Sequence, residues 1–158
     1  MADQIRVFPQ AFDGAALVAT LGPLADGPGW EEGRQQTGYR KLDLRASGEF
    51  PMAGMFHAAM DLLQPPNPAL YDHWLLHYRT GDAIPPHYDP PMGDGLAHWR
   101  LNVLVEAGEG GMLYLNGAEC LLRPGDAVLF RPDRVEHAVA VVTAGRRLVW
   151  SLGTNRAE

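Results

Sequence analysis

The chain has 158 residues, the length of one domain, and 46% of them are hydrophobic against 20% charged, which indicates a globular protein and excludes a disordered one. The net charge is −6, so a broad basic surface for nucleic acid is not expected. No run of about 20 apolar residues predicts a membrane helix, and Met1–Gln10 has no secretory signal. The single cysteine, Cys120, excludes an internal disulfide and a thiolate metal cluster, so we expect a cytoplasmic protein.

The first half of the chain predicts two helices. Asp13 is placed to cap the N-terminus of a helix over Gly14–Leu21, which Gly22-Pro23 should end. A second helix is expected over Gly54–Gln64, where apolar residues recur at helical spacing before three prolines. The other segments predicted in this half are a loop over Ala25–Gly33 and a strand over Tyr39–Arg45.

From Tyr71 the pattern changes to short strands punctuated by turns, in a chain with 18 glycines and 13 prolines. Two hairpins are expected, one across Gly117-Ala118 and one across Ala144-Gly145. The strands are expected over Trp74–Arg79, Trp99–Glu106, Met112–Asn116, Glu119–Arg123, Ala127–Arg131, His137–Thr143 and Arg146–Gly153. This predicts a mainly β fold, an antiparallel barrel or a double-stranded β-helix (jelly roll), with the helices packed outside. We expect a single domain over 1–158, with a helical and loop part over about 1–70 and a jelly-roll core over about 71–154.

The tripeptide His87-Tyr88-Asp89 is the first candidate for chemistry. Prolines on both sides, Pro85-Pro86 and Pro90-Pro91, disfavour a helix and hold the segment extended. In an extended segment residues i and i+2 point to the same side, so the imidazole and the carboxylate can converge on one metal ion. By itself a His-x-Asp is common, and its ordinary interpretation is a solvated histidine beside a turn aspartate.

His137, at the start of a later predicted strand, supplies a third donor. Two histidines and one carboxylate form the facial triad of non-haem Fe(II) oxygenases, which leaves the other coordination positions open. The nitrogen and oxygen donors suit iron without excluding zinc, manganese or nickel. We therefore predict His87, Asp89 and His137 as metal ligands and catalytic residues.

Four segments follow one another in a fixed order: Tyr78–Asp89, Arg100–Glu106 with Gly110-Gly111, Pro124–Phe130, and His137–Arg147. In this order they resemble the Fe(II)- and 2-oxoglutarate-dependent oxygenase superfamily, in particular its prolyl-hydroxylase-like branch. The resemblance covers about Trp74–Gly153, roughly half of the chain. It implies a jelly roll that binds Fe(II) and uses 2-oxoglutarate and dioxygen as cosubstrates.

The resemblance also implies a cation for the distal carboxylate of 2-oxoglutarate, which a guanidinium can hold with two hydrogen bonds. Arg147 lies at the family's spacing after His137, whereas Arg146 should point to the opposite face of the strand. Tyr78 matches the family's cosubstrate-contacting tyrosine, with a plain barrel-lining role as the alternative. Asn102, on a predicted core strand, is expected to bond either the cosubstrate or a neighbouring strand.

The implied reaction is hydroxylation of an unactivated C–H bond with release of succinate and carbon dioxide. Asp89 favours hydroxylation over halogenation, because halogenating members of the family lack this carboxylate. The sequence departs from the branch's pattern at Val141 and Glu106-Ala107, which leaves the substrate open: a small molecule, an amino acid or a peptidyl residue, prolyl included. No nucleic acid or membrane partner is expected.

The residues after the tripeptide have less defined expectations. Met92–Trp99 either forms a mobile lid over substrate or is a simple exposed connection. Arg100 is a candidate for a substrate carboxylate. Leu148 and Trp150 share the strand face opposite Arg147, so Trp150 is expected to serve packing.

Other classes of protein compete with this interpretation. A cupin-like metal enzyme or small-molecule-binding protein has a similar small β-fold, and Pro132–His137 matches the spacing of a second cupin motif. A cupin usually supplies His-x-His rather than His-x-Asp, and it has no use for Arg147. A non-catalytic binding module does not need all four of His87, Asp89, His137 and Arg147. Nucleic-acid repair is disfavoured by the acidic charge.

Overall fold

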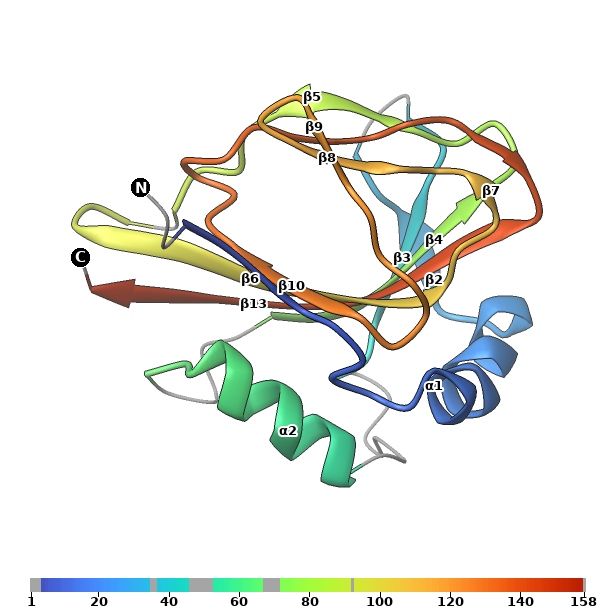
Figure 1. The fold of residues 1–158 in the computed structure, drawn as a ribbon, viewed down its shortest axis with the longest axis horizontal. Helices are drawn as coiled ribbons and strands as arrows, with labels where there is room; N and C mark the ends of the chain where they lie inside the picture. Colours follow the sequence, from blue (N-terminus) through green and yellow to red (C-terminus); the bar gives the residue numbers. More distant parts are fainter. Residues whose placement is uncertain (1–3, 35–36, 46–52, 67–71, 92, 158) are drawn as a thin grey trace.

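Two antiparallel sheets lie face to face in the computed structural model, which describes residues 4–34, 37–45, 53–66, 72–91 and 93–157 (Figure 1). The large sheet has the strand order β1 (Ile5–Phe8), β10 (Ala127–Phe130), β6 (Leu96–Glu106), β13 (Arg146–Ala157), β4 (Asp72–Arg79), β3 (Arg40–Asp43) and β2 (Trp30–Glu32). The small sheet has the order β5 (Ile84–His87), β11 (His137–Val139), β8 (Leu113–Leu115) and β9 (Ala118–Cys120). A further pair joins β12 (Val142–Ala144) to β7 (Glu109–Gly110).

The chain passes from one sheet to the other with almost every strand. From β4 it goes to β5, β6, β8, β10, β11 and β13, so that these strands belong alternately to the large and the small sheet. This alternation is the double-stranded β-helix, and it confirms the predicted fold class. Strands from before residue 71 also join the large sheet, because β1 pairs with β10 and β3 pairs with β4.

The two predicted hairpins have different outcomes. The first is confirmed, since β8 pairs with β9 across Asn116-Gly117. The second is wrong: His137 on β11 pairs with His87 and Leu115, whereas β13 pairs with β4 and β6 in the other sheet. The turn at Gly145 is real, with φ of 68°, but it carries the chain between sheets. A turn signal in the sequence does not say which sheet receives the next strand.

The helices cover the outer face of the large sheet (Figure 1). Helix α1 (Gly14–Leu21) begins as predicted, because the Asp13 carboxylate accepts hydrogen bonds from the backbone N–H groups of Ala15 and Ala16. Gly22-Pro23 does not end the helical chain, which tightens into a 3-10 helix, η2 (Gly22–Asp26). Helix α2 (Ala53–Leu63) is also confirmed. Among the described residues, no helix is long and apolar enough to span a membrane.

Two short strands in the first half were not predicted. β1 lies before α1, and β2 lies inside the segment expected to be a loop. Each has at most four residues, and each is held by one neighbouring strand, as when Trp30 pairs with Leu42. Strands this short show too little alternation of polar and apolar residues to be predicted from the sequence. Their extended conformation is fixed by the partner strand.

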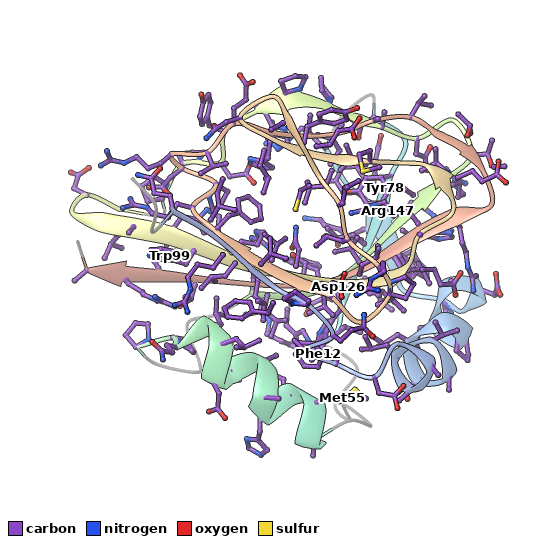
Figure 2. The ribbon with its side chains drawn as sticks, viewed as in Figure 1. Phe12, Met55, Tyr78, Trp99, Asp126 and Arg147 are labelled. Atoms are coloured by element: carbon purple, nitrogen blue, oxygen red, sulfur yellow. The ribbon has the colours of Figure 1, made fainter. Side chains whose placement is uncertain are left out.

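Alternation along β13 divides the interior into two hydrophobic clusters. Leu148, Trp150 and Leu152 belong to the cluster between the large sheet and the helices. Val149 belongs to the cluster between the two sheets. Trp150 is fully buried and donates through Nε1 to Nε2 of His73, 2.6 Å away, so it packs the core as expected. Figure 2 shows Phe12 and Met55 on the helix side of the large sheet.

Neither alternative for Met92–Trp99, a lid or a simple exposed connection, describes most of this segment. Leu96–Trp99 belongs to β6 and pairs with β13, from Leu96 opposite Ala157 to Trp99 opposite Thr154. The part before β6 is a turn at Gly93-Asp94-Gly95, and Met92 lies outside the described residues. Strand pairing of Leu96–Trp99 holds it in place, so this segment cannot open as a flap.

Leu101→Ala should lower the free energy of unfolding by about 2–5 kcal/mol, because this fully buried side chain packs between the large sheet and the helices. Leu121→Ala removes the same atoms from a side chain that is 73% exposed, and its effect should stay within about 0.5 kcal/mol. Urea unfolding of both variants measures the difference. Equal effects would contradict the assignment of Leu101 to the core.

Candidate metal centre

The three predicted ligands meet between the sheets. His87 ends β5 and His137 begins β11, and the two residues are direct partners in the pairing of these strands. Asp89 follows two residues later, and its backbone N–H donates to the carbonyl of Pro132 over 2.8 Å. One donor atom from each of the three side chains lies within 4.8 Å of the others. The structure thus brings His137 to Asp89 and His87, which precede it by 48 and 50 positions in the chain.

Backbone carbonyls orient both imidazoles. Nδ1 of His87 lies 2.8 Å from the Pro85 carbonyl, and Nδ1 of His137 lies 3.1 Å from the Val135 carbonyl. Because a carbonyl only accepts, each Nδ1 carries the proton and donates it. In the neutral imidazole this tautomer leaves the lone pair on Nε2, which faces Asp89, 3.6 Å from Oδ1 for His87 and 3.3 Å from Oδ2 for His137. A hydrogen bond from Nδ1 to a backbone carbonyl is a usual way in which a protein orients a metal-binding histidine.

The charge states suit a divalent cation. Burial lowers the pKa of His87, which favours the neutral imidazole that binds metal. Burial raises the pKa of Asp89, but the neighbouring histidines and the positive charge of Arg100 outweigh burial and lower that pKa. Asp89 is therefore a carboxylate at neutral pH. Two neutral imidazoles and one carboxylate fit Fe(II) and other first-row divalent ions.

Arg34 is a member of the site that the sequence did not reveal. Its Nη2 donates to Oδ1 of Asp89 over 2.6 Å. Arg34 follows β2 in a segment without a recognisable motif, and it reaches Asp89 only because β2 and β3 form the edge of the large sheet. No sequence signal links the two residues, which are 55 positions apart.

Arg147 and Arg146 point to opposite faces of β13. Arg147 is 6% exposed and stands opposite Tyr78 on β4, and Figure 2 shows both side chains between the sheets. Its Nε is buried without a hydrogen-bond partner, and no ion pair of Arg147 occurs among the described residues. Arg146 lies on the helix side and donates to both oxygens of Glu106, over 2.8 and 2.9 Å.

Burial lowers the pKa of Arg147, because a charged guanidinium in the interior loses its hydration. Such a group is costly unless an anion accompanies it. The side chain is also closely enclosed, since a Cβ on Gly111 would lie 3.3 Å from its Cδ. A buried guanidinium that has no acidic partner in the protein can bind the carboxylate of a ligand.

Tyr78 and Asn102 lie near the triad. Tyr78 is buried, and its ring stacks on Tyr39 with a centroid distance of 5.1 Å and an angle of 15°. Burial raises the pKa of its phenol, so it stays protonated. Asn102 accepts a hydrogen bond through Oδ1 from Oγ of Ser151, 2.7 Å away. The expected bond to a neighbouring strand is therefore present.

A cavity of about 310 Å³ surrounds the candidate metal centre. Its walls include the three candidate ligands together with Tyr78 and Asn102. Arg147, the register partner of Tyr78, does not form part of the wall. The volume is at the lower end of the range for small-molecule sites. The wall also includes Arg100, which the sequence marked, and Asp72, which it did not.

The comparisons with known proteins find relatives by structure. A scan against protein-family models and a search of curated proteins give no match. A prolyl-4-hydroxylase of Pseudomonas putida superposes with a TM-score of 0.76 at 18% identity, over 98% of this chain and 93% of that one. HygX of Streptomyces hygroscopicus, solved with nickel and 2-oxoglutarate, gives a TM-score of 0.71 at 12% identity, over 95% and 82%.

A third similar structure is the non-haem α-ketoglutarate-dependent epimerase SnoN from nogalamycin biosynthesis, with a TM-score of 0.73 at 14% identity, over 96% of this chain and 78% of that one. All three structures superpose on this chain over at least 95% of its length despite identities of 18% or less. The chain therefore has the double-stranded β-helix fold of the Fe(II)- and 2-oxoglutarate-dependent oxygenases, among which the prolyl-4-hydroxylase has a similar structure.

Proposed function

We propose that the protein is an Fe(II)- and 2-oxoglutarate-dependent dioxygenase. It hydroxylates an unactivated C–H bond of a small molecule, an amino acid or a peptidyl residue, prolyl included, and it releases succinate and carbon dioxide. Two structural features together carry the proposal. Two imidazoles and a carboxylate converge within 4.8 Å, and a buried guanidinium without an acidic partner among the described residues lies on the facing sheet.

His87, Asp89 and His137 would hold the metal and would leave coordination positions for the cosubstrates. Fe(II), when bound, would supply the dioxygen chemistry, in which one oxygen atom enters the substrate and the other enters succinate. The carbonyls of Pro85 and Val135 accept from Nδ1 of His87 and His137, which would leave Nε2 of each ring to bind the ion. Asp89 contributes the negative charge, and Arg34 holds one of its oxygens.

Arg147 and Tyr78 form the cosubstrate end of the site. Arg147 would bind the distal carboxylate of 2-oxoglutarate, which neutralises its charge and gives its nitrogens acceptors. Tyr78 lines the cavity, whereas its register partner Arg147 does not, so cosubstrate binding to Arg147 requires a local side-chain movement there. Asn102 uses Oδ1 for Ser151, so its amide NH₂ group is left to donate to the cosubstrate.

A cupin-like metal enzyme or binding protein that does not use 2-oxoglutarate is the second candidate. It accounts for the triad but gives Arg147 no role. The cytoplasm remains our proposed location for the reaction. A small molecule or a peptide remains the proposed partner.

Adding Fe(II) and then 2-oxoglutarate to the anaerobic protein tests the proposal directly. Chelation of the metal by the cosubstrate should produce a visible metal-to-ligand charge-transfer band, which Fe(II) alone does not give. Difference spectra measure it before any substrate is known. Fe(II) binding without such a band would favour the cupin-like alternative.

His87→Ala and Asp89→Ala should each abolish turnover of 2-oxoglutarate, because each removes one of the three metal donors. Both side chains are partly exposed at the cavity, so the fold should survive, as circular dichroism can show. Succinate release measures the activity. Normal release from either variant would contradict the triad.

Arg147→Gln should raise the half-saturating concentration of 2-oxoglutarate at least about tenfold, because hydrogen bonds to a charged group contribute roughly 1.5–3 kcal/mol each. Arg146→Gln is the matched control on the adjacent residue. Its partly exposed ion pair with Glu106 faces the helices, so its effect should stay below about twofold. Titration of the charge-transfer band compares them, and equal effects would mean that Arg147 does not bind the cosubstrate.

A further inference from the structure

Besides the candidate metal ligands, the cavity is lined by an ion pair between Arg100 and Asp72. Arg100 on β6 donates to both oxygens of Asp72 on β4, through Nη1 to Oδ1 over 3.2 Å and through Nη2 to Oδ2 over 2.8 Å. Both side chains line the cavity, and they are 15% and 34% exposed. Nη1 of Arg100 also donates to Oγ of Ser151 over 2.9 Å, and Ser151 in turn donates to Asn102.

The backbone is arranged to admit this pair. Asp72 and Arg100 are both register partners of Gly153, which lies on β13 between their two strands. The side chains meet across the middle strand, above the glycine. A Cβ on Gly153 would lie 2.6 Å from Oδ1 of Asp72 and 2.7 Å from Nη2 of Arg100, so any other residue would displace the pair.

The pair is joined to the metal end of the cavity. Nε2 of His98 lies 3.4 Å from Nη2 of Arg100, and Nδ1 of His98 lies 3.4 Å from the Asp89 carbonyl. His98 therefore accepts from Arg100 and donates to the segment that carries a metal ligand. A ligand held by the pair would lie in the same cavity as the candidate metal centre.

Stability alone does not account for the pair. Replacing a buried ion pair with apolar residues is often neutral or stabilising, because the two charges lose their hydration. This pair is partly open to the cavity instead, so its charges can be shared with a ligand. Asp72 is also the one cavity carboxylate, among the described residues, that is not a candidate metal ligand.

The walls of the cavity offer partners for charges of both signs. They carry three cations, Arg34, Lys41 and Arg100, and the two carboxylates of Asp72 and Asp89, and Nζ of Lys41 also lies 3.3 Å from a carboxylate oxygen of Glu31. A ligand that carries both an ammonium and a carboxylate suits such a wall better than a simple anion. Lys41 extends over the ring of Trp74 at 4.3 Å, on the same wall of the cavity as Asp72.

We propose that Asp72 and Arg100 bind the ammonium and the carboxylate of a free α-amino acid, which is the substrate of the proposed hydroxylase. The inference rests on the proposed function. In an α-amino acid the ammonium nitrogen and the carboxyl carbon are both bonded to Cα and lie about 2.5 Å apart, so both charged groups of the ligand can face one compact ion pair at once. A zwitterion can thus lie antiparallel to the pair with both charges matched. A residue inside a peptide has no main-chain charges to offer.

The test compares free and blocked amino acids on the anaerobic wild-type complex with Fe(II) and 2-oxoglutarate. The protein amino acids are added one at a time, and each one that responds is compared with its N-acetyl methylamide. At least one free amino acid should shift the charge-transfer band and stimulate succinate release. Its blocked form should bind at least about tenfold more weakly, because both charges are gone.

The outcomes separate the two proposals. Absence of the band itself would overturn the proposed function. A normal band with no response to any free amino acid, or with equal binding of the blocked form, would overturn the substrate assignment and leave the proposed function standing.

Asp72→Asn provides a second measurement. It should weaken the responding amino acid at least about tenfold while the band with 2-oxoglutarate still forms, because the ammonium loses its counter-charge. Arg146→Gln is the matched control, since it breaks a two-pronged pair of the same kind on the other face of β6 and β13. An unchanged affinity in Asp72→Asn would overturn the assignment. Should Asp72→Asn lose the band, the wild-type comparison decides alone.

Discussion

The pairing of β5 with β11 is the interaction on which the candidate site depends. It places His87 directly opposite His137, although 50 residues separate them, and it leaves Asp89 two residues past the end of β5. The ladder fixes the backbone at both histidines. The carbonyls of Pro85 and Val135, each two residues before its histidine, then fix the rings. A slip of one residue in this register would turn one imidazole to the outer face of the small sheet.

The opposite wall takes Asp72, Trp74, Leu76 and Tyr78 from β4, and the strand that supports it in the middle of the large sheet is β13. The inward residues of β13 have three different roles. Arg147 belongs to the proposed cosubstrate end, Ser151 donates the hydrogen bond to Asn102, and Gly153 leaves room for the pair of Asp72 with Arg100. Its outward residues pack against the helices. One strand thus supports the core on one face and organises the cavity on the other, so the fold and the site are built together.

The arginines of the cavity region show how surroundings decide a role. Arg100 is paired with Asp72 and Arg34 with Asp89, so each of these two cations has an acidic partner in the protein. Arg147 is buried more deeply than either and has no acidic partner among the described residues. Burying a cation in this way costs free energy that only a bound anion can recover. The three residues are chemically identical, and they are distinguished by what lies opposite them.

The sequence by itself determined the local features: the cap at Asp13, the two helices, most strands of the second half, the His87-x-Asp89 spacing and the opposite orientation of Arg146 and Arg147. Each of these follows from the periodicity of a helix or strand, or from a residue's own conformational limits. Only the tertiary structure decided that β11 and β13 belong to different sheets, that Leu96–Trp99 is strand, and that Arg34 and Asp72 reach the cavity. These features depend on which distant strands pair, and pairing is chosen by the burial of whole faces, which no local pattern records.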